Sequence, residues 1–225
     1  MFLTAVAICA VAPAAMRGGT LFSDLGPAGN VYGAGNYGVM GSGADIFHPG
    51  QTPLSDTVAN LFTASGTGSL PVTGIDLAVR NMGGPSTFYA SIWTDSGGDP
   101  GVQVAGAYWS LSTSTSEPGC CELVSITGIT GVTLTGGQQY FMVLGPLSIT
   151  DNSWNGWNWN NQSVTGLILG SSDGGSSWNL FGANSTLGGF DVTSNGSAPE
   201  PATWPMLLAL AGAGLWWRRR KRAVA

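Results

Sequence analysis

Tryptophans and asparagines interleave in one short part of the chain. Three indole rings occur at Trp154, Trp157 and Trp159, and asparagines surround them at Asn152, Asn155, Asn158, Asn160 and Asn161. Indole faces can stack on the apolar C–H faces of sugar rings, while amides hydrogen-bond to hydroxyl groups. The segment therefore predicts a carbohydrate contact. The alternative is that the rings close the open end of a β-sandwich and the asparagines form turns.

Two carboxylates occur in a glycine-rich turn. Asp95 and Asp99 flank Gly97 and Gly98, and carboxylates four residues apart could ligate Ca²⁺, which prefers oxygen ligands. Turns of this composition also form without a metal, so simple turn chemistry is the alternative. A zinc site lacks ligands because His48 is the single histidine. We therefore expect no cofactor, with calcium as the one metal candidate.

Cys120 and Cys121 are adjacent, and Cys9 is the third cysteine of the chain. Cys9 lies in a segment that we expect to be removed, so no third partner is left in the body. In an oxidising compartment we expect a vicinal disulfide between Cys120 and Cys121. Intermolecular bridges and two unpaired thiols are the alternatives.

Charge is divided unevenly along the chain. Residues 15–198 contain eleven acidic and two basic residues, a net charge of −9, and residues 199–225 contain five basic and one acidic, a net charge of +4; the sum is the overall −5. A body with two cations cannot neutralise a phosphate backbone, which excludes nucleic acid as a partner. The basic residues of the tail form one cluster: Arg218, Arg219, Arg220, Lys221 and Arg222.

The C-terminal end has three parts in a fixed order. Pro199, Glu200 and Pro201 come first, the apolar stretch 202–217 follows, and the basic cluster 218–222 comes last. As a helix the apolar stretch is about 24 Å long, and snorkelling arginines extend its reach toward the ~30 Å hydrocarbon core. We predict a single transmembrane helix with its basic tail in the cytoplasm and the body outside.

This three-part pattern resembles the PEP-CTERM sorting signal of Gram-negative bacteria. The resemblance covers about residues 198–225. It implies that an exosortase, a membrane protease-transpeptidase, processes the chain near Pro199, Glu200 and Pro201. It further implies an association with exopolysaccharide and biofilm matrix, with this chain as the cargo of the system.

The N-terminal residues 1–15 predict a secretory signal peptide. An apolar run is followed by small residues, with cleavage expected after Ala14 or Ala15. No Lys or Arg precedes the run, so the n-region is truncated or unusual, and a buried strand is the alternative. At the other end of the body, residues 194–198 predict a short flexible spacer.

Residues 16–193 show short alternating runs that glycine and proline interrupt. Ile75, Leu77 and Val79 alternate with Asp76, Ala78 and Arg80. Further runs predict strands at 58–63, 88–93, 102–111, 123–126, 132–134, 139–144, 164–169 and 190–193. The pattern predicts an all-β fold, an antiparallel jelly-roll-like sandwich with one packed and one wet face on each sheet.

Two stretches of this body, 88–101 and 134–144, are similar to the choice-of-anchor domains, which are β-sandwich ectodomains found with varied C-terminal sorting signals. That family supplies no catalytic residues to carry over.

Together these features predict an exported, non-enzymatic protein of the cell surface or extracellular matrix. Its expected partners are an exosortase-type membrane transpeptidase, exopolysaccharide and, before processing, the inner membrane, with the body in the periplasm. Two alternatives stay open. One is a secreted glycan-active hydrolase with a carboxylate pair that the sequence does not identify, and the other is a purely structural matrix protein without a ligand.

Overall fold

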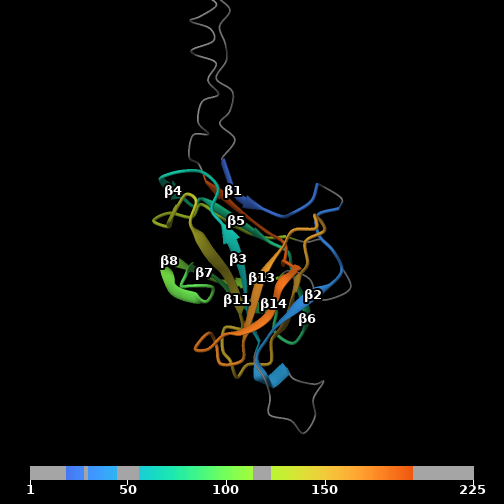
Figure 1. Cartoon of the computed structure of the whole chain (residues 1–225). Helices are drawn as coiled ribbons and strands as arrows, with labels where there is room; N and C mark the ends of the chain where they lie inside the picture. Colours follow the sequence, from blue (N-terminus) through green and yellow to red (C-terminus); the bar gives the residue numbers. More distant parts are fainter. Residues whose placement is uncertain (1–18, 28–29, 45–55, 114–122, 195–225) are drawn as a thin grey trace, which may run out of the picture. The chain divides into compact units, whose positions relative to one another are not determined.

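The computed structural model describes residues 19–27, 30–44, 56–113 and 123–194, which belong to one compact unit (Figure 1). Several predicted features lie outside these residues: the signal peptide 1–15, the Cys120–Cys121 pair, spacer residues 195–198 and the sorting signal 199–225. Within the described ranges, no helix is long and apolar enough to cross a membrane.

Four antiparallel sheets make up the described body, which agrees with the predicted all-β class and is consistent with a sandwich. The six-stranded sheet contains, in spatial order, β14 (Asn179–Thr186), β13 (Thr165–Ser171), β3 (Thr57–Thr63), β11 (Gln139–Gly145), β7 (Thr87–Asp95) and β8 (Pro100–Ser112). The four-stranded sheet contains β1 (Gly19–Ser23), β15 (Phe190–Ser194), β5 (Gly74–Leu77) and β9 (Val124–Thr127). The three-stranded sheet contains β2 (Asn36–Met40), β12 (Trp154–Asn158) and β6 (Val79–Gly83). Strands β10 (Thr133–Thr135) and β4 (Ser69–Pro71) form a pair, and a 3₁₀ turn, η1, covers Ser42–Ala44.

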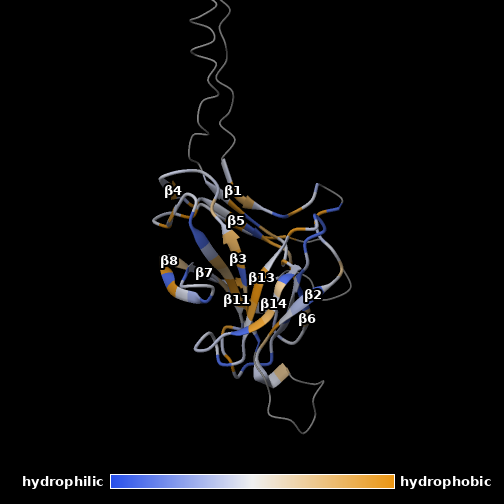
Figure 2. Cartoon of the chain, viewed as in Figure 1, coloured by the Kyte–Doolittle hydropathy of each residue, from blue (hydrophilic) through white to orange (hydrophobic). Residues whose placement is uncertain are grey.

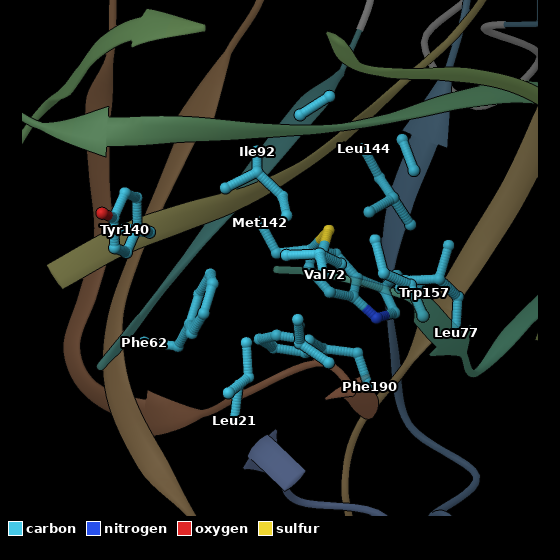
Figure 3. Packing of buried hydrophobic residues seen from close by; sticks show 14 of the residues in the cluster. Leu21, Phe62, Val72, Leu77, Ile92, Tyr140, Met142, Leu144, Trp157 and Phe190 are labelled. Carbon is cyan, nitrogen blue, oxygen red and sulfur yellow. The ribbon is translucent and has the colours of Figure 1, made fainter. Parts of the chain in front are cut away.

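The main core lies between the six-stranded and the four-stranded sheets. Aromatic rings from both sheets meet there: the ring centroids of Phe62 and Phe190 are 5.5 Å apart, and those of Phe22 and Phe190 are 4.6 Å apart. Figure 3 shows Phe62 and Phe190 in the same cluster as Met142 and Trp157. Burial of this apolar area, at roughly 25 cal/mol per Å², provides the main driving force for bringing the sheets together.

The predicted alternation is confirmed in β5 and β7. Ile75 and Leu77, and likewise Phe88, Ala90 and Ile92, are buried in the main core. The run through Val79 does not stay in one strand, however. At Ala78 the backbone bonds to Gly189 and Asn158, and the chain passes from β5 in the four-stranded sheet to β6 in the three-stranded sheet.

The predicted strand at 102–111 is confirmed as β8, although its first apolar residue lies in solvent. Val102 is 73% exposed, whereas Ala107 is buried. The pairing with β7 shifts between Tyr108 and Gln103, a stretch that includes Gly106 at φ 75°. Because this bulge inserts an odd number of residues into β8, Val104 before it and Ala107 after it both lie on the side of the main core.

The expectation of a wet second face is wrong for the six-stranded sheet. On the side turned away from the main core, which we call the outer face, Ala59, Phe141, Val143 and Leu169 form a second buried cluster. Figure 2 shows apolar residues along β3 and β13. This sheet is therefore apolar on both sides at its centre.

Candidate functional site

The Trp/Asn segment forms β12, the central strand of the three-stranded sheet. Its buried amides donate hydrogen bonds to backbone carbonyls of other segments. The Asn155 side chain donates to the carbonyl of Thr87 at 3.0 Å, and the Asn158 side chain donates to the carbonyl of Gly33 at 3.1 Å. Both asparagines are fully buried. Because both amide N–H groups are buried and paired with backbone carbonyls, these side chains hold neighbouring segments together and do not face a ligand.

Trp157 corrects the predicted three-ring sugar contact. Its side chain is 0% exposed, its indole N–H donates to the carbonyl of Gly189 at 3.1 Å, and its ring lies 5.7 Å from that of Phe190. A ring enclosed in this way offers no face to a sugar. The sequence pattern gave the wrong prediction for Trp157 because tryptophan occurs both in carbohydrate-binding surfaces and in hydrophobic cores.

The other two tryptophans lie at opposite ends of β12: Trp154 is its first residue, and Trp159 directly follows its last residue. Trp154 is half-buried and pairs with Met40, whereas Trp159 is 39% exposed and its ring is 5.8 Å from that of Tyr37. Five residues of extended chain separate them by about 17 Å. The rings therefore do not form one joint platform.

Trp154 does line a surface hollow. The hollow has a volume of about 180 Å³ and is bounded by Gly43, Ala44, Gly83, Gly84, Asn152 and Trp154. Gly84 has φ +64°, and a Cβ there would lie 2.0 Å from the carbonyl oxygen of Asn152, so this wall requires glycine. Small-molecule pockets are commonly ~300 Å³ or more. The hollow therefore suits a group of monosaccharide size beside an indole and an exposed amide.

The predicted calcium turn is held by its own hydrogen bonds. The Asp95 carboxylate accepts the backbone N–H of Gly98 at 2.8 Å, and Gly97 and Gly98 adopt φ values of 72° and 99°. Among the described residues, no cluster of three or more His, Cys, Asp or Glu side chains could hold a metal ion. The arrangement around Asp95 and Asp99 is accounted for as an Asx-type turn.

A carboxylate pair that was not singled out from the sequence lies on the four-stranded sheet. Asp76 on β5 and Asp191 on β15 are directly opposite each other, with Ser125 and Ser23 as their next neighbours across the sheet. Burial, and to a smaller extent the Asp76 charge, raises the pKa of Asp191. Each aspartate lies between two apolar residues, so the sequence could have predicted that both point away from the core. It could not have predicted that the two strands pair with these residues opposite each other.

Asp24 follows β1 and is 1% exposed. One carboxyl oxygen accepts the backbone N–H of Phe190 at 2.6 Å, and Oδ2 has no hydrogen-bond partner. Desolvation raises the pKa of Asp24 to about 8, and the nearby Asp191 charge acts in the same direction. The side chain is thus a neutral acid through most of the physiological pH range.

Comparison with known proteins identifies the C-terminal end. A family model described as the PEP-CTERM protein-sorting motif matches residues 197–221, which include Pro199, Glu200, Pro201 and most of the basic cluster. No curated protein and no solved structure matches the chain. The chain therefore carries a PEP-CTERM sorting motif, which indicates an exported protein that an exosortase-type membrane enzyme processes.

Proposed function

We propose that the chain is a non-enzymatic protein of the cell surface or extracellular matrix that associates with exopolysaccharide after exosortase processing. The match to the sorting motif at residues 197–221 is the observation that carries this proposal. The proposal includes an N-terminal signal peptide, a transmembrane helix at 202–217 and a jelly-roll-like body of the choice-of-anchor kind.

The hollow beside Trp154 supports a carbohydrate contact by the body. It combines an indole with the exposed amide of Asn152, and its remaining lining residues are glycine and alanine. No charged residue lines it. In a body with a net charge of −9, an uncharged hollow favours a neutral sugar over an acidic one.

Sorting is tested by following the C-terminal end. We expect mass spectrometry of the extracellular protein to find no peptides from the segment after Pro201. A variant with alanine at Pro199, Glu200 and Pro201 should stay in the membrane fraction and retain residues 218–225. An extracellular wild-type product with an intact 218–225 segment would contradict exosortase processing.

The carbohydrate contact is tested with Trp154→Ala. Because loss of an aromatic contact is worth about 1 kcal/mol, we expect binding of a neutral polysaccharide such as hydroxyethyl cellulose to weaken about fivefold in affinity electrophoresis. Asn152→Ala should weaken it as well, and Trp159→Ala serves as the matched control with unchanged binding. Thermal unfolding of each variant checks that the fold is intact.

Two results would replace this proposal with its alternatives. If the wild-type protein binds no polysaccharide, a purely structural matrix role takes its place. If the protein cleaves a polysaccharide and Asp191→Asn abolishes the turnover, it is a glycan-active hydrolase that uses the Asp76–Asp191 pair.

A further inference from the structure

The two large sheets differ in the chemistry of the faces that they turn away from the main core. On the four-stranded sheet this face carries the row Ser23, Asp191, Asp76 and Ser125. A polar row is what a sheet exposed to water requires. On the six-stranded sheet the corresponding face carries Phe141, Val143 and Leu169, packed under further aromatic and aliphatic side chains. The surface above this cluster is therefore formed by the side chains that cover it, among them Tyr89, Trp93 and Trp178.

One cross-strand row runs over the whole outer face. Each residue is the register partner of the next, from β8 at one edge to β14 at the other: Tyr108, Ser91, Val143, Ala59, Leu169 and Leu180. The four central members are at most 4% exposed, whereas Tyr108 is 45% and Leu180 is 62% exposed. Strands are about 4.8 Å apart, so six strands make a row ~24 Å long. The large side chains at the two edges are accessible, whereas the centre of the row lies beneath the side chains that cover it.

Two aromatic pairs lie on either side of this row. The rings of Tyr89 and Tyr108 are stacked at 5.2 Å, and those of Trp93 and Trp178 meet edge to face at 6.4 Å. Tyr89 and Trp93 are four residues apart on β7, so the pairs are separated by about 13 Å. Tyr89, Trp93 and Trp178 are partly buried and pack against the outer cluster, which fixes their orientation.

Each aromatic pair has a hydrogen-bonding side chain beside it on the edge strand β8. Ser110 is the register partner of Tyr89, and Gln103 is the register partner of Trp93. Both of these polar residues are exposed. Rigid rings with adjacent hydroxyl and amide groups can contact the apolar faces and the hydroxyl groups of sugars.

The distribution of charged residues around this surface favours a neutral ligand. The cross-strand row and both aromatic pairs contain no charged residue. In the turn that precedes Trp178, the Asp173 carboxylate accepts hydrogen bonds from the Ser171 and Ser177 hydroxyls, at 2.7 and 2.6 Å. These bonds lower the pKa of Asp173 to about 2, so this exposed carboxylate stays ionised. A fixed negative charge near the rings disfavours an acidic polysaccharide.

The geometry points to a second carbohydrate surface: on the outer face, the Tyr89–Tyr108 and Trp93–Trp178 pairs together bind a neutral polysaccharide chain. The choice of ligand class rests on the proposed association with exopolysaccharide. The surface is separate from the Trp154 hollow, which lies on the three-stranded sheet and admits one small group. With both, one protein would contact a polymer at two places and gain avidity.

The test compares Tyr108→Ala with Tyr108→Phe in the full-length chain in detergent. Hydroxyethyl cellulose is the neutral probe and alginate the acidic one, both in affinity electrophoresis. We expect Tyr108→Ala to bind the neutral polymer about five- to tenfold more weakly, and Tyr108→Phe, which keeps the ring, to bind like the wild type. Alginate should bind more weakly than the neutral polymer to all forms. Phe181→Ala, a change at another exposed aromatic residue, is the matched control.

The outcomes separate this inference from the proposal on which it rests. If the wild type binds and only Trp154→Ala weakens binding, the outer face is not a carbohydrate surface, while the association with polysaccharide stands. If the wild type binds neither polymer, both fail. If Tyr108→Ala instead abolishes a concentration-dependent self-association seen by analytical ultracentrifugation, the face joins two copies of the chain and the inference is overturned.

Discussion

Stability is expected to fall as the pH rises from about 4 to about 8, at roughly 1.4 kcal/mol per pH unit from Asp24 alone. The pKa of this carboxyl rises from 3.8 in the unfolded chain to about 8 in the folded one. In that window the folded state therefore holds a proton that the unfolded state has lost. The contribution is fully present below pH 4 and is lost as the pH passes through 8.

The Asp24→Asn variant isolates this contribution. An amide keeps the acceptor for the Phe190 N–H and carries no charge at any pH. We expect the variant to be less sensitive to pH and more stable than the wild type at pH 8, by urea unfolding at several pH values. Asp191 shifts in the same direction in both proteins, so the difference between them reports Asp24. Asp99→Asn, at an exposed carboxylate, is the control. Parallel curves for the wild type and Asp24→Asn would rule out a protonated Asp24.

Trp157→Ala is expected to destabilise the fold by about 3–5 kcal/mol, the range for removing a large aromatic side chain from a core. The ring is fully buried against Phe190, and its loss also leaves the Gly189 carbonyl without its donor. Neighbouring glycine is matched to the ring, since a Cβ on Gly188 would lie 2.6 Å from it.

Trp159→Ala is the matched comparison for this prediction. Its side chain is 39% exposed, so we expect a loss of about 1 kcal/mol or less. The midpoints and slopes of urea unfolding for both variants decide the question. Equal, small losses for the two substitutions would show that Trp157 does not belong to the core.

The strands with strict alternation could be predicted from the sequence. In β5 and β7 the apolar positions Ile75, Leu77, Phe88, Ala90 and Ile92 repeat every second residue, and all of them are buried. This pattern is local, because one residue in two must face the core wherever a sheet packs on another.

β12 and Asp24 could not be predicted in this way, because their roles depend on distant partners. The strand Trp154–Asn158 is rich in asparagine and glycine, which disfavour strands, and it exists because β2 and β6 pair with it on both sides. Asp24 is buried by contacts with Phe190, far along the chain. The apolar outer face was likewise hidden, since Tyr89, Ser91 and Trp93 resemble the exposed half of an amphipathic strand.

The pairing of the first and last described strands has a mechanical consequence. β15 ends at Ser194, which is the register partner of Gly19 on β1, and β15 is bonded on its other side to β5. A pull on the C-terminal end of β15 is therefore resisted by two rows of backbone hydrogen bonds along the strand. If the load enters through sugars bound elsewhere on the body, these rows are stretched together in shear and do not open one by one. In a protein attached through its C-terminal end, the strand closest in sequence to the attachment would thus be the one that two neighbouring strands hold against tension.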